Sequence, residues 1–153
     1  MTSLGKYQNR EILWVDYSSY KSAFPNNDWL CLAVANSNPN WENFEDFIRI
    51  SIAQNILEFK GCGLFGEKLY DRFDEVMNIM EVIENHNDIE VITTWHNNET
   101  LADTFWQCFF ATSLPETTDF ENIKIVCVDL DGVDRRNELQ NYIQKFEWGW
   151  IPE

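Results

Sequence analysis

The sequence predicts an α/β fold: a three-layer sandwich with a mostly parallel sheet of about four or five strands and helices on both faces. Continuous apolar runs, WLCLAVA at 29–35 and NIKIVCV at 122–128, are typical of strands that are buried on both faces. Between these runs, apolar residues recur at helical spacing. Strands that alternate with helices indicate parallel βαβ units, each crossing over with a right hand.

The length of 153 residues predicts one domain, residues 1–153, that buries a core without disulfides or a metal ion. Hydrophobic residues make up 44% of the chain and aromatic residues 15%, which excludes a disordered protein. The 26 acidic and 11 basic residues give a net charge of −15. Such a charge repels nucleic acids and anionic membranes and attracts basic proteins, so neither nucleic acid nor membrane is an expected partner.

The cytoplasm is the expected compartment. The first residues, MTSLGKYQNR, contain no apolar run, and no stretch approaches the length needed to cross a bilayer. The cysteines are scattered and form no CxxC motif, which is typical of reduced, buried thiols. They are Cys31, Cys62, Cys108 and Cys127.

The first elements are a strand, a second strand and a helix. ILWVDY at 12–17 is rich in strand formers and predicts an edge strand. The buried strand 29–35 follows. Pro39 and Asn40 then open a helix whose apolar residues share one face.

The segment LEFKGCGLFG at 57–66 has two interpretations. It is either the glycine-capped end of the preceding helix or a short strand that contains glycine. The strand is favoured because a new helix begins at Glu67, with an apolar stripe that runs from Leu69 to Ile83.

The stretch from Asp88 to Leu114 predicts a strand, a polar loop and a helix. Residues 89–94 are expected to form the central strand of the sheet. Asn97 or Asn98 would cap the helix, with Glu99 in its first turn. Apolar residues on this helix continue at helical spacing as far as Thr112.

The last elements are the strand 122–128, which ends in DLDGVD, and a helix over about 134–146. The tail FEWGWIPE places Trp148 and Trp150 at the surface or folded back on the core.

Polar residues follow each predicted strand, and the carboxyl ends of parallel strands meet at one edge of a sheet. We expect a rim there that could bind a small ligand, with Trp95 as an apolar wall. Polar loops at strand ends have the same composition in any α/β protein, so this composition alone does not define a site. The ligand-binding candidates on this rim are Asn36, Ser37, Thr93, Thr94 and Trp95.

The catalytic candidates on the rim are His96, Glu99, Asp129, Asp131 and Cys62. His96 and Glu99 have the H-x-x-E spacing of a base and the group that orients it. Cys62 lies between two glycines but has no histidine close in sequence to activate it. With only two histidines, no metal site is expected, and without a glycine-rich phosphate motif no cofactor is expected.

Asp129-Leu130-Asp131-Gly132-Val133 resembles the aspartyl nucleophile motif of haloacid-dehalogenase-type phosphatases. The resemblance implies that the first aspartate attacks phosphorus and that the second acts as acid and base. It covers only these five residues, and about twenty residues follow, which is too few for the family's downstream motifs. An Asp–Gly turn is therefore the favoured interpretation, with Mg²⁺ binding as the alternative.

A wider resemblance rests on Thr93-Thr94-Trp95-His96 with Glu99, and on Asp71 and Asp74. With these residues, roughly residues 28–130 resemble a small bacterial α/β family of uncharacterised function. The resemblance implies the α/β fold and the candidate rim, and it implies no reaction.

The function that these observations favour is an acidic cytosolic protein-binding module, an immunity-type inhibitor or regulator of a basic partner such as a toxin or nuclease. Between Glu67 and Glu90 the chain has eight acidic residues against Lys68 and Arg72. The alternative is a small enzyme or nucleotide-binding domain that uses the strand-end rim. The partner-binding candidates are Asp71, Asp74, Glu75, Glu81, Trp148 and Trp150.

Overall fold

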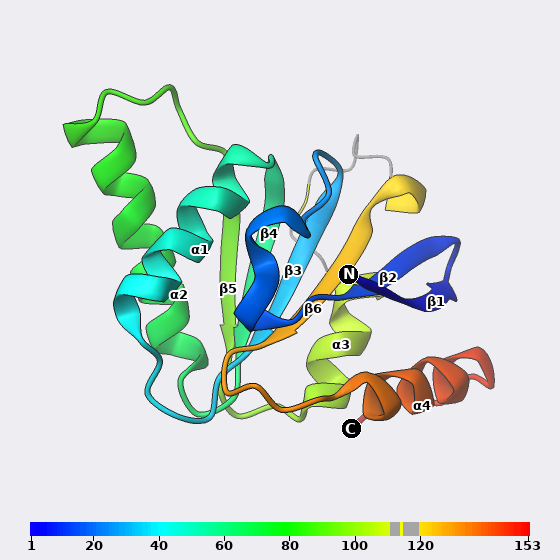
Figure 1. Ribbon diagram of the computed structural model, residues 1–153. Helices are drawn as coiled ribbons and strands as arrows, with labels where there is room; N and C mark the ends of the chain where they lie inside the picture. Colours follow the sequence, from blue (N-terminus) through cyan, green and yellow to red (C-terminus); the bar gives the residue numbers. More distant parts are fainter. Residues whose placement is uncertain (111–113, 115–119) are drawn as a thin grey trace.

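In the computed structural model, which describes residues 1–110, 114 and 120–153, six strands form one sheet with helices on both faces (Figure 1). The strand order is β1-β2-β6-β3-β4-β5. The β1–β2 pair is antiparallel, and the pairs from β2 to β5 are parallel. The strands are β1 (Thr2–Tyr7), β2 (Arg10–Trp14), β3 (Trp29–Val34), β4 (Ile56–Cys62), β5 (Ile92–His96) and β6 (Lys124–Asp129).

Four α-helices are described: α1 (Trp41–Ala53), α2 (Gly66–Asn78), α3 (Leu101–Phe110) and α4 (Arg136–Glu147). A π-helical segment η2 (Ile79–Ile83) extends α2, and the short 3₁₀ segments are η1 (Tyr17–Ser22) and η3 (Phe120–Asn122). Among the described residues, no helix is both long and apolar enough to cross a membrane.

The sheet separates two cores, because side chains of a strand alternate between its faces. In β3, Cys31 and Ala33 pack with α1 and α2, whereas Leu30 and Leu32 pack with α3 and α4. Both faces of β3 are thus apolar, which explains its continuous apolar sequence. The predicted α/β class, the mostly parallel sheet and the helices on both faces are confirmed, with one more strand than expected (Figure 1).

The amino-terminal edge of the sheet differs from the prediction. The strand expected at the edge is β2, and it lies between β6 and an unpredicted strand, β1. β1 reads TSLGKY, and of its residues only Leu4 is buried, so it has no apolar run that would indicate a strand. The pairing of β1 with β2 shifts register between Ser3 and Gly5, which is a β-bulge.

The prediction that residues 89–94 form the central strand is wrong, because β5 begins at Ile92 and lies at the edge of the sheet. Ile89 and Val91 pack against the α1–α2 core without being part of a strand. The central positions belong to β6 and β3, whose side chains are buried along nearly their whole length. The strand interpretation of 57–66 is confirmed by β4.

The predicted cap of α3 is also wrong. Thr100 caps this helix, since its hydroxyl accepts a hydrogen bond from the Asp103 amide at 3.1 Å. Glu99 precedes the first turn, and Asn97 instead caps α2, accepting from the Glu67 amide at 2.9 Å. Thr112, to which the helical pattern extended, lies outside the described residues.

Candidate functional site

The carboxyl ends of β3 and β6 lie side by side, and the chain leaves them toward opposite faces of the sheet. After β3 it continues to α1, and after β6 it continues to α4 (Figure 1). In open α/β sheets this switch point is where the crevice for a ligand forms. The residues that follow these two strands therefore make up the first part of the candidate site.

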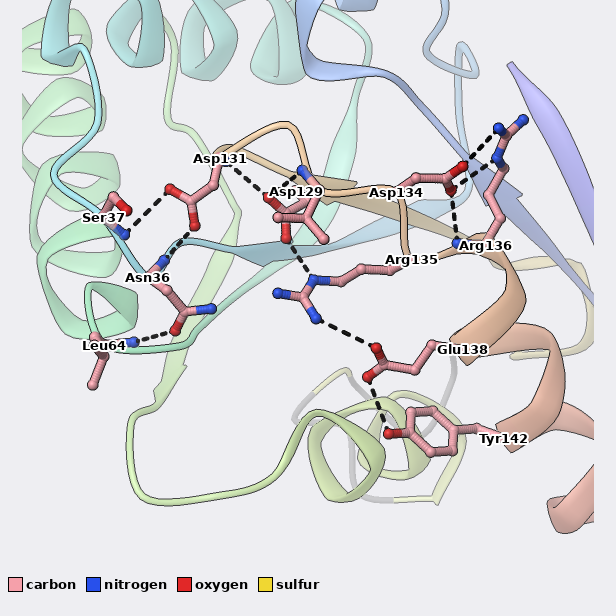
Figure 2. A network of polar contacts seen from close by, with 11 residues as sticks. Asn36, Ser37, Leu64, Asp129, Asp131, Asp134, Arg135, Arg136, Glu138 and Tyr142 are labelled. Carbon is pink, nitrogen blue, oxygen red and sulfur yellow. Dashed lines mark hydrogen bonds and ion pairs between the residues drawn. The ribbon is translucent and has the colours of Figure 1, made fainter.

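At the switch point, the Asp131 carboxylate binds the loop that follows β3 (Figure 2). Its oxygens accept hydrogen bonds from the backbone amides of Asn36, at 2.7 Å, and Ser37, at 3.2 Å. The Asn36 side chain in turn accepts from the amide of Leu64, after β4, at 3.1 Å. Three strand ends are thus joined, and the amides of Asn36 and Ser37 already have an anionic partner.

Asp129, the last residue of β6, is 1% exposed, and both of its carboxylate oxygens are in use. Oδ1 accepts from the amides of Asp131 at 2.8 Å and Val133 at 3.2 Å. Oδ2 accepts from Nε of Arg135 at 2.5 Å (Figure 2). With Gly132 at a φ of +79°, this is the geometry of an Asp–Gly turn. A nucleophilic carboxylate would need one oxygen directed at a substrate.

The turn is linked to α4 through a chain of polar side chains. Arg135 also donates to Glu138, at 3.4 Å, and Glu138 accepts from the Tyr142 hydroxyl at 3.0 Å (Figure 2). Partial burial and then the hydrogen bond to Glu138 raise the pKa of Tyr142. This network holds α4 against the end of β6.

A pocket of about 330 Å³ lies beside the turn, between the carboxyl ends of β2 and β6. Asp129, Asp131 and Asp134 line it together with Asp16, and Trp14 and Tyr17 supply its apolar part. Lysine and arginine are not among its lining residues, so it does not suit the phosphates of a nucleotide. Among the described residues, no group of three or more His, Cys, Asp or Glu is placed to hold a metal ion.

His96 and Glu99 form a second polar cluster, at the end of β5. His96 Nδ1 lies 2.8 Å from Glu99 Oε2, and Nε2 lies 3.1 Å from the Thr94 hydroxyl. Gln107 of α3 donates to the same Glu99 oxygen at 2.7 Å. His96 and Glu99, which the sequence spacing predicts as a pair, are in contact. Both imidazole nitrogens of His96 contact neighbouring side chains.

The two clusters do not share a cavity. The register aligns His96 with Cys62, Cys62 with Val34 and Val34 with Asp129, so all four are at the same level of the sheet. β3 and β4 lie between His96 and Asp129, and neighbouring strands are about 4.8 Å apart, which separates the two residues by roughly 14 Å. No residue of β5 lines the pocket beside Asp129.

Cys62, the candidate nucleophile, is buried in the core beneath α3 and α4. Burial is the largest cause that raises the pKa of its thiol, followed by the Coulomb effect of the buried Cys108. The other three cysteines are also buried, and burial raises the pKa of each, to about 12 for Cys108. Thiolate is the reactive form of cysteine, so these environments favour unreactive thiols.

We therefore expect the native protein to resist alkylation. Iodoacetamide at pH 8 should leave all four thiols unmodified, and the same treatment in guanidinium chloride should modify all four. Intact-mass spectrometry distinguishes the two results. Rapid modification of Cys62 alone in the native protein would contradict its burial and restore it as a candidate nucleophile.

The structure separates the predicted partner-binding residues into two groups. The acidic residues are on α2 and η2, and α2 packs against β4 and β5, at one edge of the sheet. Trp148 and Trp150 follow α4, which packs against β1 at the opposite edge. Trp150, 39% exposed, stacks on Phe146, whereas Trp148 is 75% exposed. The acidic side chains and these two tryptophans do not form one surface.

Within the acidic group, the four predicted residues differ in their contacts. Asp71 and Glu75 are exposed, and Glu75 accepts from Arg72 at 2.8 Å. Asp74 is half-buried and accepts from the Thr93 hydroxyl at 2.6 Å, and Glu81 is half-buried. Asp74 therefore has a structural role in fixing β5 on α2.

A stronger charge signal lies further along the chain than the predicted window. Between Arg72 and Lys124 there is no lysine or arginine. This segment, residues 73–123, includes the second half of α2 and all of η2, β5, α3 and η3. The predicted window from Glu67 to Glu90 ends inside this segment and therefore contains only part of it. Its acidic residues are Asp74, Glu75, Glu81, Glu84, Asp88, Glu90, Glu99, Asp103, Glu116, Asp119 and Glu121.

The mostly parallel sheet, its helices on both faces and its switch point define an open, doubly wound α/β protein. The chain belongs to the family described as Domain of unknown function (DUF7684), whose model matches residues 13–146. This agrees with the resemblance to an uncharacterised α/β family. Neither the curated proteins nor the solved structures include a match to the chain.

Proposed function

We propose that this chain is an acidic protein-binding module that docks a basic partner protein, as an immunity-type inhibitor or regulator does. The observation that carries the proposal is the segment 73–123, which has eleven acidic residues and no lysine or arginine. Seven of these acids, from Asp74 to Glu99, lie on α2, on η2 or in the chain on either side of β5, which is an edge strand of the sheet. Concentrated charge accelerates encounter with an oppositely charged protein.

Apolar contacts would supply the affinity of such a complex. An exposed aromatic residue beside α2 is Trp95, which is 45% exposed and packs on Tyr70 of α2 with their ring centroids 4.7 Å apart. The Asp74 carboxylate is the largest cause that raises the pKa of Tyr70, as expected for a negative surface. Trp95 therefore replaces Trp148 and Trp150 as the proposed anchor.

The contacts at the rim favour this function over the enzymatic alternative. Both oxygens of Asp129 are bound inside the Asp–Gly turn, and Asp131 is bound to the amides of Asn36 and Ser37. Two strands, β3 and β4, separate His96 from them. A reaction that uses these groups together would require the switch point to rearrange.

The test compares two variants with the same net charge. In the first, called the β5-edge variant, four exposed acids on α2 and in the chain leading to β5 are neutralised: Asp71→Asn, Glu75→Gln, Asp88→Asn and Glu90→Gln. In the second, four acids elsewhere are neutralised: Glu11→Gln, Asp28→Asn, Glu147→Gln and Glu153→Gln. Each set changes the net charge from −15 to −11.

The partner is the basic protein that the unmodified chain retains from its own host and that binds again after purification. We expect the β5-edge variant to associate with it about tenfold more slowly and with a flatter salt dependence, as electrostatic steering predicts. The control variant should keep the native association rate. Equal rates for all three proteins, or an equal loss in both variants, would refute a docking surface at this edge.

A further inference from the structure

The outer side of β5 is an open sheet edge. β5 pairs with β4 on one side, in parallel from Ile92 to His96 without a register shift. In residues 1–110, 114 and 120–153, no hydrogen bond reaches the backbone of β5 from its other side. Alternate N–H and C=O groups of a strand point to each side, so β5 presents a row of free backbone donors and acceptors.

The opposite edge of the same sheet is protected in the ways that natural proteins protect edges, and β5 is not. β1 has a register shift between Ser3 and Gly5, which twists the strand, and Lys6 places a charge on it. The β5 sequence, ITTWH, contains no lysine, proline or bulge. The β5 edge, at the opposite end of the sheet from the protected β1 edge, is therefore open to pairing with another strand.

Contacts on both faces hold β5 in an extended shape. On the α2 face, Thr93 donates to Asp74 at 2.6 Å and Trp95 packs on Tyr70. On the α3 face, His96 contacts Thr94 and Glu99. A strand that is already held extended loses little conformational entropy when another strand pairs with it, and this favours binding.

The charge around β5 selects the kind of strand that fits. Acidic residues flank it on the chain, with Asp88 and Glu90 before it and Glu99 and Asp103 after it, and Asp74 contacts it from α2. A second copy of this chain would bring the same acids against them, because like surfaces meet in a two-fold pairing. A strand with lysine or arginine side chains would instead complement them.

We propose that the outer edge of β5 binds an extended basic segment of a partner protein, which adds to the sheet as a further strand. This rests on the proposed function, because it states how the basic partner is held. Backbone hydrogen bonds supply the affinity, the flanking acids select basic side chains, and Trp95 packs against the added strand.

The probe is a fluorescein-labelled ten-residue peptide of alternating lysine and valine, with binding measured by anisotropy. Two control peptides accompany it: one has glutamate in place of lysine, and one is N-methylated at every backbone amide, which keeps the charge and removes the backbone N–H donors. Two variants of the full chain also form a matched pair, Trp95→Lys and Trp148→Lys. Each variant adds one positive charge. Trp95→Lys adds it on β5, and Trp148→Lys adds it after the end of α4.

We expect the lysine peptide to bind and to slow hydrogen exchange in β5 but not in β1. The N-methylated peptide and the Trp95→Lys protein should each bind at least tenfold more weakly, whereas Trp148→Lys should bind like the unmodified chain. Equal binding of the N-methylated peptide would overturn strand addition while leaving a charge-driven docking surface in place.

Three other results would also overturn the inference. One is a lysine peptide that does not bind, and a second is a glutamate peptide that binds equally well. The third is a homodimer, seen by sedimentation, that protects β5. The proposed function fails separately, when the captured basic protein associates with the β5-edge charge variant at the native rate.

Discussion

Replacing Asp129 with asparagine is expected to destabilise the folded protein by about 3 kcal/mol. The buried carboxylate accepts two backbone amides and the Arg135 guanidinium. Asparagine has nearly the same shape but one acceptor oxygen and no charge, so the Arg135 cation, whose side chain is only 17% exposed, would keep only its longer contact with Glu138, at 3.4 Å. Removing one member of a buried ion pair costs much more than the pair itself contributes, because the other charge then lacks its main partner.

Urea unfolding followed by circular dichroism measures this change. The matched control is Asp134→Asn, which removes an ion pair with Arg136 whose side chains are 46% and 59% exposed. Pairs of this kind contribute at most about 1 kcal/mol. If both variants unfold at the same urea concentration, Asp129 does not hold the turn, and a role in chemistry would become the better explanation for it.

Replacing Gly63 with alanine should also destabilise the protein by about 3 kcal/mol, for a steric reason. Gly63 follows β4 with a φ of +87°, and a Cβ there would lie 2.5 Å from the Ala35 carbonyl oxygen. That oxygen cannot move freely, because it accepts a hydrogen bond from the Phe65 amide at 2.9 Å. The substitution therefore combines a left-handed backbone with a collision against fixed backbone.

Gly132 provides the comparison, since its φ is +79° but a Cβ there would meet nothing within 4 Å. Gly132→Ala should lower the free energy of unfolding by about 1 kcal/mol, which is the cost of a left-handed backbone for alanine. Thermal unfolding of both variants under the same conditions separates the two contributions. Similar melting temperatures would show that the loop after β4 moves away from β3 without strain.

The buried elements of the fold could be predicted because their signals are local. Strands 29–35 and 122–128 have apolar side chains on both faces, and helix α2 has an apolar stripe, so each pattern reflects the burial that the structure shows. The edges could not be predicted in this way. β1 buries Leu4 alone, and β5 is polar because an edge strand needs little burial.

The position of β5 depended on information that the local pattern does not contain. Ile89 and Val91 are as apolar as strand residues, but they pack against the core from outside the sheet. Which strand is central is decided by the crossover from β5 back to β6, which inserts β6 between β2 and β3. That choice depends on contacts across the whole chain.

The residues of the candidate site were predicted in part, and their partners were not. The rule that polar groups gather at strand ends located Asn36, Ser37, Asp129 and Asp131. The sequence could not show that Asp131 binds the two amides at Asn36 and Ser37, because residues more than 90 positions apart make these contacts. The role of Arg135 was missed because nothing in its local sequence marks it as the partner of Asp129.

The carboxylate of Asp131 gives the switch point the properties of an intramolecular complex. Because the anion is part of the chain, its effective concentration at the amides of Asn36 and Ser37 is fixed by the fold and not by the solution. A free phosphate or carboxylate would have to compete with a tethered one that pays no translational entropy on binding. In this fold the crevice that often binds a diffusible ligand is occupied by a contact that joins β3 to β6, and the recognition that we propose takes place at the outer edge of β5 instead.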